Sequence, residues 1–411
     1  LNNEEELQSY FIRQIEKHLN LKGKKMIGWD EILEGGLSPN ASIMSWRGMA
    51  GGIEAARAKH DVIMCPGSHC YFDSYQSLNP SEPLAIGGYT PLSRTYAFEP
   101  VPSELKPNER KYIMGAQGNV WTEYMETDKQ VLYMAYPRAI ALAEVNWTSA
   151  SQKDYANFLE RLQHHVSWFE KQDMSLTQGM LDLGYTSVGD EKGLVFVFQK
   201  PPVAGKILIE TVRNGDIASE YLKQDSFILD HDIDFKAWYQ LSDGSIGKPL
   251  RILYQNHLAS GKNIQLLETP ADRYFTGGSQ VLLNGIEAPS LKYSGPEWVG
   301  MEGKDFHAII DFGKDQAFQS VQFQFFHEPG AWIYRPKDLE FSWSLDGKQY
   351  TDPVKFQISD TKSKYLNPTV PCASAKGRYL KILIRNHGEI EAGLPGAGHK
   401  AWLFLGEISV R

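Results

Sequence analysis

The stretch KKMIGWDEILEGGL, residues 24–37, runs from a short apolar segment through a tryptophan into two adjacent carboxylates, Asp30 and Glu31. An apolar strand that opens into a loop at polar residues is typical of parallel β-structure, where functional residues gather at the carboxyl ends of the strands. Two interpretations follow. Either the carboxylates are the acid/base pair of an enzyme, or Trp29 is the residue that carries the function.

The same pattern recurs further along the chain. Apolar strands are predicted within residues 40–48, 61–67 and 112–121, with a helix at 49–60 and a long loop at 74–110. Alternation of helices with near-continuously apolar strands predicts a parallel sheet buried on both faces, as in a (β/α) barrel. A closed barrel needs eight strands, and we count four. Either the fold is a smaller open sheet, or the chain is the C-terminal half of a (β/α)8 barrel.

Three helical segments flank these strands. Residues 2–20 and 153–172 are amphipathic, and residues 128–147 predict a helix kinked at Pro137. An amphipathic helix turns its apolar side toward a core. In the first segment that side is a stripe with a spacing of four, formed by Leu7, Phe11, Ile15 and Leu19.

Beyond residue 185 the pattern changes to short strands with alternating apolar residues, separated by turn signals such as Asn214-Gly215 and Asp346-Gly347. This part is all-β and too long for one small sandwich. A break near residues 256–265 divides it. We therefore predict an α/β part followed by two β-sandwiches, with domains at 1–180, 181–262 and 263–411.

Composition excludes several classes of protein. A net charge of −8 without a block of like charges argues against nucleic acid and anionic membranes as partners. No apolar run approaches the roughly 20 residues of a membrane helix. The chain's three cysteines cannot form a disulfide framework, and we expect free thiols. No pattern of metal ligands stands out, so we expect neither a metal nor a cofactor.

Polar and aromatic side chains follow all four predicted strands. They are Trp29, Trp46, the Tyr71-x-Asp73 pair and the Trp121-x-Glu123 pair. In a parallel sheet these positions meet at one rim, where aromatic walls and a few carboxylates form a pocket suited to a sugar.

These motifs, within GWDEI, SWRG, YFD and GNVWTE, resemble the second half of the glycoside hydrolase family 20 barrel over residues 1 to about 175. That family contains the β-N-acetylhexosaminidases. The resemblance implies that Trp29, Trp46 and Trp121 wall the pocket for the N-acetyl group and the sugar face. It implies that Tyr71, the one catalytic residue present, donates to the acetamido oxygen and helps hold the oxazolinium intermediate. Substrate hydroxyls at C4 and C6 would bind Asp73 and Glu123.

In this family the nucleophile is the substrate's own acetamido oxygen, and an adjacent Asp-Glu pair orients it and supplies the proton. That pair follows the fourth barrel strand, whereas Trp29 matches the end of the fifth. Asp30 and Glu31 therefore lie one strand too late, and neighbours along a strand point to opposite faces. We expect one of them to cap the next loop or to pair with a base. The catalytic pair is then absent, and we expect the isolated chain to be inactive.

Less specific resemblances concern the rest of the chain. Residues 181–262 resemble a fibronectin-like sandwich, and residues 263–411 resemble the discoidin or factor V/VIII C-type sandwich shared by carbohydrate-binding modules. The expected partners are N-acetylhexosamine-terminated glycans and the missing N-terminal half of the barrel. A bacterial periplasmic, secreted or cell-surface location follows from the family. Loop aromatics that could stack on a glycan are Tyr293, Trp298, Trp332 and Tyr334.

Two alternatives stay open. The chain could be a non-catalytic glycan-binding or adhesion fragment, or another barrel glycosidase that uses Asp30 or Glu31 as its acid. Among secondary candidates, Arg47 is expected to pair with a carboxylate and His69 to be structural. A binding subsite for the group attached to the sugar could include the loop aromatics Tyr89, Tyr96 and Phe98.

Overall fold

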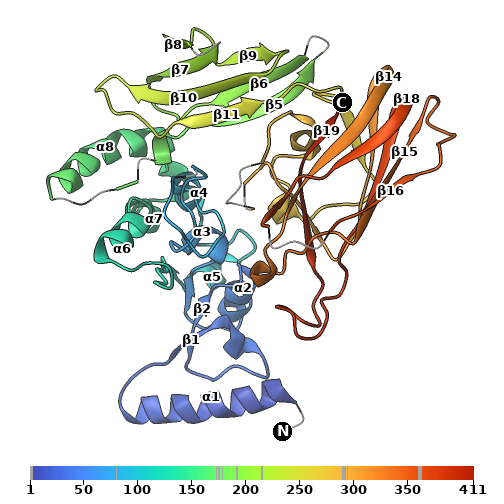
Figure 1. Cartoon of the computed structure of the whole chain (residues 1–411). Coiled ribbons are helices and arrows are strands. Elements are labelled where there is room, and N and C mark those ends of the chain that lie inside the picture. The colour runs from blue at the N-terminus through green and yellow to red at the C-terminus, as the bar shows by residue number, and fades with distance from the viewer. Residues whose placement is uncertain are drawn as a thin grey trace. The chain divides into compact units, whose positions relative to one another are not determined.

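The structure is a computed structural model that describes residues 3–79, 81–172, 174, 176–177, 179–190, 193–213, 216–288, 293, 295–359 and 363–411. The chain divides into two compact units, Leu1–Met180 and Leu181–Arg411. The first unit mixes helices and strands, and the second is almost entirely β-structure (Figure 1). The finer boundary between residues 262 and 263 stays a prediction.

The first unit is built on one parallel sheet. Its strands are hydrogen-bonded in the order β1-β2-β3-β4. Because each new strand is added on the same side of the previous one, this is the singly wound order of a (β/α) barrel rather than the reversing order of a doubly wound sheet. The strands span Ile27–Trp29, Ser42–Ser45, Val62–Met64 and Ile113–Ala116, within the four segments predicted.

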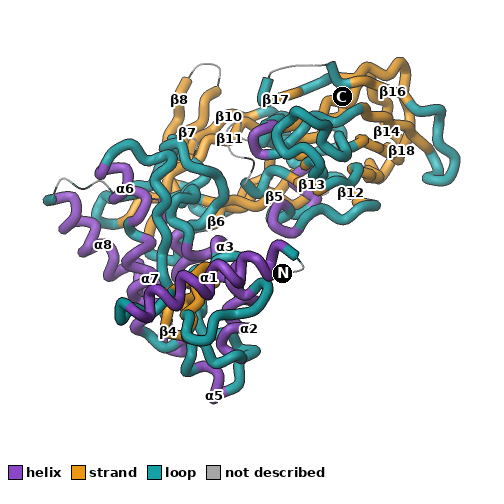
Figure 2. Tube along the Cα trace, turned by 90° about the horizontal axis from the view of Figure 1, so that it is seen from below, coloured by secondary structure: helices purple, strands orange, loops and turns teal. Residues whose placement is uncertain are grey.

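Helices join and flank these strands, as Figure 2 shows. The expected loop at 74–110 contains two short helices. The helices are α1 (Glu4–Leu21), α2 (Ala50–Arg57), α3 (Gly67–Cys70), α4 (Leu92–Ala97), α5 (Pro107–Arg110), α6 (Asp128–Ala135), α7 (Arg138–Trp147) and α8 (Tyr155–Lys171). Short 3-10 helices lie at η1 (Asp30–Leu33), η2 (Ala150–Gln152) and η3 (Gly179–Leu181).

The segment 128–147 is not one kinked helix. It forms two helices, α6 and α7, divided at the cis peptide Tyr136–Pro137. Proline has no backbone N–H to donate, so the helical hydrogen-bond ladder cannot continue through it. The consequence for the site is that Arg138 becomes the first residue of a new helix.

The predicted apolar stripe of α1 is largely exposed. Leu7, Phe11 and Ile15 are 55%, 62% and 40% exposed, whereas Leu19 packs against the core of the first unit. The buried side of α1 instead carries Ser9 and Glu16. Ser9 Oγ donates to the Gly36 carbonyl and Glu16 Oε1 accepts from the Asn40 amide, so polar bonds fasten α1 to the loop after β1.

The described residues of the second unit form three sheets. One has the order β5-β6-β9, one has the order β11-β10-β7-β8, and the largest contains β13-β19-β14-β18-β15-β16 with β12 and β17 attached to β14. The strands are β5 (Gly184–Asp190), β6 (Gly193–Gln199), β7 (Gly205–Arg213), β8 (Asp216–Tyr221), β9 (Ser226–Leu229), β10 (Ile233–Leu241), β11 (Leu250–Tyr254), β12 (Asn263–Leu266), β13 (Val299–Glu302), β14 (Phe306–Phe326), β15 (Asp338–Ser344), β16 (Val354–Gln357), β17 (Tyr365–Leu366), β18 (Thr369–Arg385) and β19 (Trp402–Val410).

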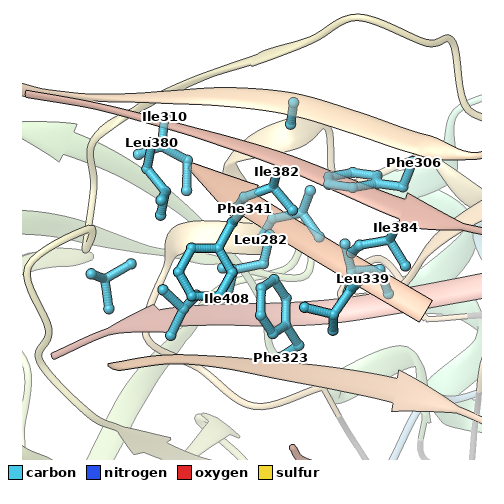
Figure 3. Close-up of a cluster of buried hydrophobic side chains, with 14 of the residues drawn as sticks. Leu282, Phe306, Ile310, Phe323, Leu339, Phe341, Leu380, Ile382, Ile384 and Ile408 are labelled. Carbon is cyan, nitrogen blue, oxygen red and sulfur yellow. The ribbon is translucent and has the colours of Figure 1, made fainter. Parts of the chain in front are cut away.

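The core of the second unit lies on the largest sheet. Figure 3 shows side chains from β14, β15, β18 and β19 packed with Leu282. One strand of the largest sheet, β14, is 21 residues long, and its pairing with β18 shifts register between Asp311 and Gln316. An irregular register bends a strand without ending it. The turn signal Asn214-Gly215 lies outside the described residues.

A buried polar contact closes the second unit. His257 Nε2 lies 2.8 Å from Glu407 Oε1, and His257 Nδ1 accepts from the amides of Ala259 and Val410. The imidazole therefore ties the segment before β12 to the last strand.

None of the helices among the described residues is long and apolar enough to cross a membrane.

Candidate functional site

The four strand ends of the first unit carry the residues singled out from the sequence. Trp29 ends β1, and Trp46 follows β2 directly. The ladder between β3 and β4 extends beyond both strands, because Tyr71 bridges to Asn119 and the Phe72 amide donates to the Asn119 carbonyl at 2.7 Å. This extension brings the loop after β3 beside the loop after β4.

A glycine permits this close approach. A Cβ at Gly118 would lie 2.5 Å from the ring of Phe72, so any larger residue would push the two loops apart. Phe72 is itself buried between Tyr71 and Asp73. The packing of Phe72 against Gly118 therefore positions its two neighbours, Tyr71 and Asp73.

The aromatic residues predicted to form a wall lie in pairs. The ring centroids of Trp29 and Trp121 are 6.1 Å apart, and those of Trp46 and Tyr71 are 6.2 Å apart. A hydrogen bond from Trp121 also lowers the pKa of the Tyr71 phenol, against the larger effect of burial. The four rings therefore gather at one end of the sheet, while Trp121 stays 44% exposed and the site remains open.

Tyr71 is suited to donate a hydrogen bond. Burial, reinforced by the charge of the Cys65 thiolate form, raises the pKa of Tyr71 to about 12. The phenol is therefore protonated at neutral pH. Burial likewise raises the pKa of Cys65 to about 11, so that thiol is a poor nucleophile. All three cysteines are free and buried.

Asp73 is the most unusual carboxyl of the site. Its side chain is 5% exposed, and its Oδ1 atom is buried without a hydrogen-bond partner among the described residues. Burial and the neighbouring Glu123 raise the pKa of Asp73 to about 6, against the effect of Arg138. A buried acceptor without a partner costs free energy, which a ligand hydroxyl would recover.

Asp30 and Glu31 have different partners from each other. Asp30 is buried and pairs with Arg47, whose Nε lies 2.9 Å from Asp30 Oδ1. This confirms the expectations that one carboxylate pairs with a base and that Arg47 pairs with a carboxylate. Glu31 instead accepts from Trp46 Nε1, at 2.9 and 3.0 Å to its two oxygens.

The strand-alternation rule does not apply to these two residues. The strand ends at Trp29, and Asp30–Leu33 form the 3-10 helix η1, so strand geometry does not direct Asp30 and Glu31 to opposite faces. The 3-10 turn sends Asp30 toward Arg47 and Glu31 toward an indole of the aromatic wall.

Several secondary candidates have structural roles. Tyr96 and Phe98 are 4% and 3% exposed, so the expectation that they line a subsite is wrong. His69 packs on Phe98 at 5.1 Å between ring centroids. In the second unit, Trp298 and Tyr334 are buried, which excludes them as stacking platforms, whereas Trp332 is 39% exposed.

Sequence reasoning missed Arg138. Its guanidinium is fully buried and donates to backbone carbonyls around Asp73. The sequence did contain a signal for it: an arginine begins the apolar helix RAIALAEV directly after Pro137, at a position where its charge is not expected to reach water.

Comparison with known proteins finds relatives for the first unit. Residues 1–150 match the model of glycosyl hydrolase family 20, catalytic domain. This segment belongs to that family. The family 20 segment includes all four strands and the complete aromatic cluster, and it ends before α8.

Relatives of the family 20 segment carry the same name. A beta-hexosaminidase of Porphyromonas gingivalis is 55% identical over 163 residues, which are 39% of this chain and 21% of the relative. A beta-hexosaminidase of Vibrio furnissii is 39% identical over 142 residues, 34% of this chain and 23% of the relative. The chain thus spans about a fifth of the length of these curated relatives.

Solved structures align over a similar part. The crystal structure of a GH20 exo β-N-acetylglucosaminidase from Vibrio harveyi is 32% identical, with a TM-score of 0.40, over 42% of this chain and 28% of that chain.

Proposed function

We propose that this chain supplies part of the substrate pocket of a β-N-acetylhexosaminidase, which removes terminal, non-reducing β-linked N-acetylhexosamine from glycans. One observation carries the proposal. Trp29, Trp46, Tyr71 and Trp121 gather at the ends of four consecutive parallel strands, beside Asp73, whose Oδ1 is buried without a partner in the described chain.

Each residue has a role that its surroundings support. The indoles of Trp29, Trp46 and Trp121 form the wall against the N-acetyl group and the sugar face. Tyr71, protonated at neutral pH, donates to the acetamido carbonyl oxygen. The carboxylates of Asp73 and Glu123 accept from the hydroxyls at C4 and C6 of the sugar.

The reaction is substrate-assisted and retains configuration. The acetamido carbonyl oxygen forms a bond to C1, and the glycosidic C1–O bond breaks. The electron pair of that bond goes to the leaving oxygen, which takes a proton from a general acid. Water then attacks C1 of the oxazolinium ion, the bond between C1 and the acetamido oxygen breaks with its electron pair returning to that oxygen, and the water gives up a proton to the same group, now a base. Intramolecular attack is fast because the reacting atoms are already close.

The orienting Asp and the general acid Glu are assigned to the other half of the barrel. The two adjacent carboxylates of this chain already have partners: Asp30 pairs with Arg47, and Glu31 accepts from Trp46. The preceding barrel half is therefore a required partner, and the isolated chain is expected to be inactive. The exposed apolar residues of α1 and the edge strands β1 and β4 provide surface for that partner.

The remaining segments are proposed to be accessory. Residues 181–262 are assigned as a fibronectin-like sandwich and residues 263–411 as a discoidin-like sandwich, in a bacterial periplasmic, secreted or cell-surface protein. Among the loop aromatics considered for glycan contact, Trp332 is 39% exposed, and its ring stacks on that of His399.

The test is turnover of 4-nitrophenyl N-acetyl-β-glucosaminide by this chain and by the same chain joined to a preceding barrel half. Only the longer protein is expected to turn over, and Tyr71→Phe and Asp73→Asn should each slow it. Turnover by this chain alone would refute the absence of the catalytic pair. Glycan binding without turnover in either protein would favour an adhesion fragment, and loss of turnover in Glu31→Gln would favour Glu31 as the acid.

A further inference from the structure

Arg138 is a buried cation at the start of α7. Its side chain is 0% exposed, and its four hydrogen bonds all go to backbone carbonyls. Nη2 donates to Phe72 at 2.5 Å and to Met134 at 2.6 Å, and Nη1 donates to Ser74 and Thr90 at 3.0 Å each.

Two of these carbonyls flank Asp73. The guanidinium therefore binds the chain on both sides of the carboxylate. Its Cζ atom also lies 5.1 Å from the ring centroid of Phe72. Arginine's fork of donors can hold several carbonyls in a fixed relation, which a single ammonium point charge cannot reproduce.

Burying the guanidinium of Arg138 costs free energy that a residue with only a packing role would not have to overcome. Burial lowers the pKa of Arg138 to about 9, which reflects the free energy of removing the charge from water. The charged or titratable groups that face Arg138 are Asp73, Glu82 and Tyr133. Of these, Asp73 is the one placed at the strand ends with an unpartnered oxygen.

We propose that Arg138 is a positioning residue for Asp73: by holding the Phe72 and Ser74 carbonyls it keeps the free carboxylate oxygen aimed at a hydroxyl of the bound sugar. The inference rests on the proposed sugar site. The positive charge also favours ionised Asp73 against burial and the repulsion from Glu123. Arg138 thus acts on the substrate through Asp73 and does not touch it.

A double-mutant cycle in the 411-residue chain tests this role. Affinity for N-acetylglucosamine is measured by NMR titration in wild type, Arg138→Gln, Asp73→Asn and the double variant. We expect Arg138→Gln to weaken binding about tenfold in the wild-type background and less than about twofold when Asp73 is already Asn, since coupled residues are not additive. Equal losses in both backgrounds would refute the proposal.

Two further variants control for folding. Arg335→Gln removes a guanidinium that donates to the Ile358 carbonyl in the second unit, and it should leave sugar affinity unchanged. Arg138→Lys keeps the charge but not the fork, so its affinity should lie between wild type and Arg138→Gln. If Arg138→Gln does not fold, the cycle is run with Arg138→Lys, and the same additivity criterion applies.

A readout without sugar separates the two proposals. Carboxyl ¹³C NMR follows the ionisation of Asp73, whose pKa is about 6 and should rise further in the Arg138→Gln variant. An unchanged pKa of Asp73 would count against the role of Arg138 even if the sugar binds. Conversely, if wild type binds no N-acetylglucosamine but the pKa of Asp73 rises in the variant, the sugar site fails and the link between Arg138 and Asp73 stands.

Discussion

Glu31 shows how a side chain outside the predicted pocket can shape it. Its carboxylate accepts from the indole nitrogen of Trp46, and that indole pairs with Tyr71. Adjacent polar residues and a strand-end tryptophan were visible in the sequence. The partner of Glu31 was not, because it depends on the 3-10 turn at Asp30–Leu33, and no residue pattern separates that turn from a continued strand.

Variants of Glu31 separate an orienting role from an acid role. Glu31→Gln keeps an oxygen acceptor for Trp46 Nε1, so affinity for N-acetylglucosamine should stay within about twofold of wild type. Glu31→Ala leaves the indole N–H without its partner, and a loss of about 1–2 kcal/mol, roughly 5–30-fold in affinity, is expected. Glu34→Gln, at an exposed carboxylate that binds Arg47, is the matched control. Equal losses in Gln and Ala variants would contradict the orienting role.

Asp73 should impose a pH dependence on stability. Its pKa is raised to about 6 in the folded chain, so the folded state binds more protons than the unfolded state. Stability from this group is therefore complete below its unfolded pKa of about 4 and is lost as the pH rises through about 6. A shift of two units corresponds to about 3 kcal/mol.

The measurement is urea unfolding of wild type and Asp73→Asn from pH 4 to pH 8. The free energy of unfolding of wild type should fall relative to that of the variant by about 2–3 kcal/mol across this range. Parallel curves would show that Asp73 titrates normally. Because other carboxyls titrate in both proteins, only the difference between them is informative.

At the scale of elements, the sequence predicted helices and strands better than their packing. The four parallel strands and α8 lie where apolar periodicity placed them, and Phe158, Leu159 and Leu162 of α8 are buried as expected. Periodicity shows that a helix has an apolar side but not what covers it. In α1, Ile12 and Leu19 pack against the core of the first unit, and Ser9 and Glu16 add polar bonds to distant partners that have no local signature.

The exposed stripe of α1 gives a stability prediction. Phe11→Glu should change the free energy of unfolding of this chain by less than about 0.5 kcal/mol, because the ring is already in water. Phe158→Ala, on the buried side of α8, should cost about 3–5 kcal/mol through the cavity it leaves. Denaturant unfolding of both variants checks this. A large loss in Phe11→Glu would mean that α1 packs through its apolar stripe in solution.

At the scale of the whole molecule, the two compact units should unfold separately. His257→Ala removes the side-chain partner of the buried Glu407 carboxylate, which keeps the Gly285 amide as a donor to its other oxygen, and two acceptor contacts, so it should destabilise the second unit by about 3–5 kcal/mol. Calorimetry should show two transitions, of which this variant lowers only one. His231→Ala, at an exposed pair with Asp230, should move neither. A shift of both transitions would indicate one cooperative unit.

Local sequence patterns predicted where the first unit ends but not the long-range contacts within the second unit. The change from helix–strand alternation to short strands marked the end of the first unit near residue 180. Contacts such as that between His257 and Glu407 join residues 150 positions apart, and no local period records them.

The place of β19 has a consequence for synthesis. This strand, buried along its whole length, sits between β13 and β14 in the largest sheet. The ribosome makes residues 402–410 after every other strand of that sheet, so a nascent chain exposes the facing edges of β13 and β14 until they emerge. Such open edges invite pairing with other chains, and the second unit is therefore expected to need protection by chaperones until translation has passed its final strand.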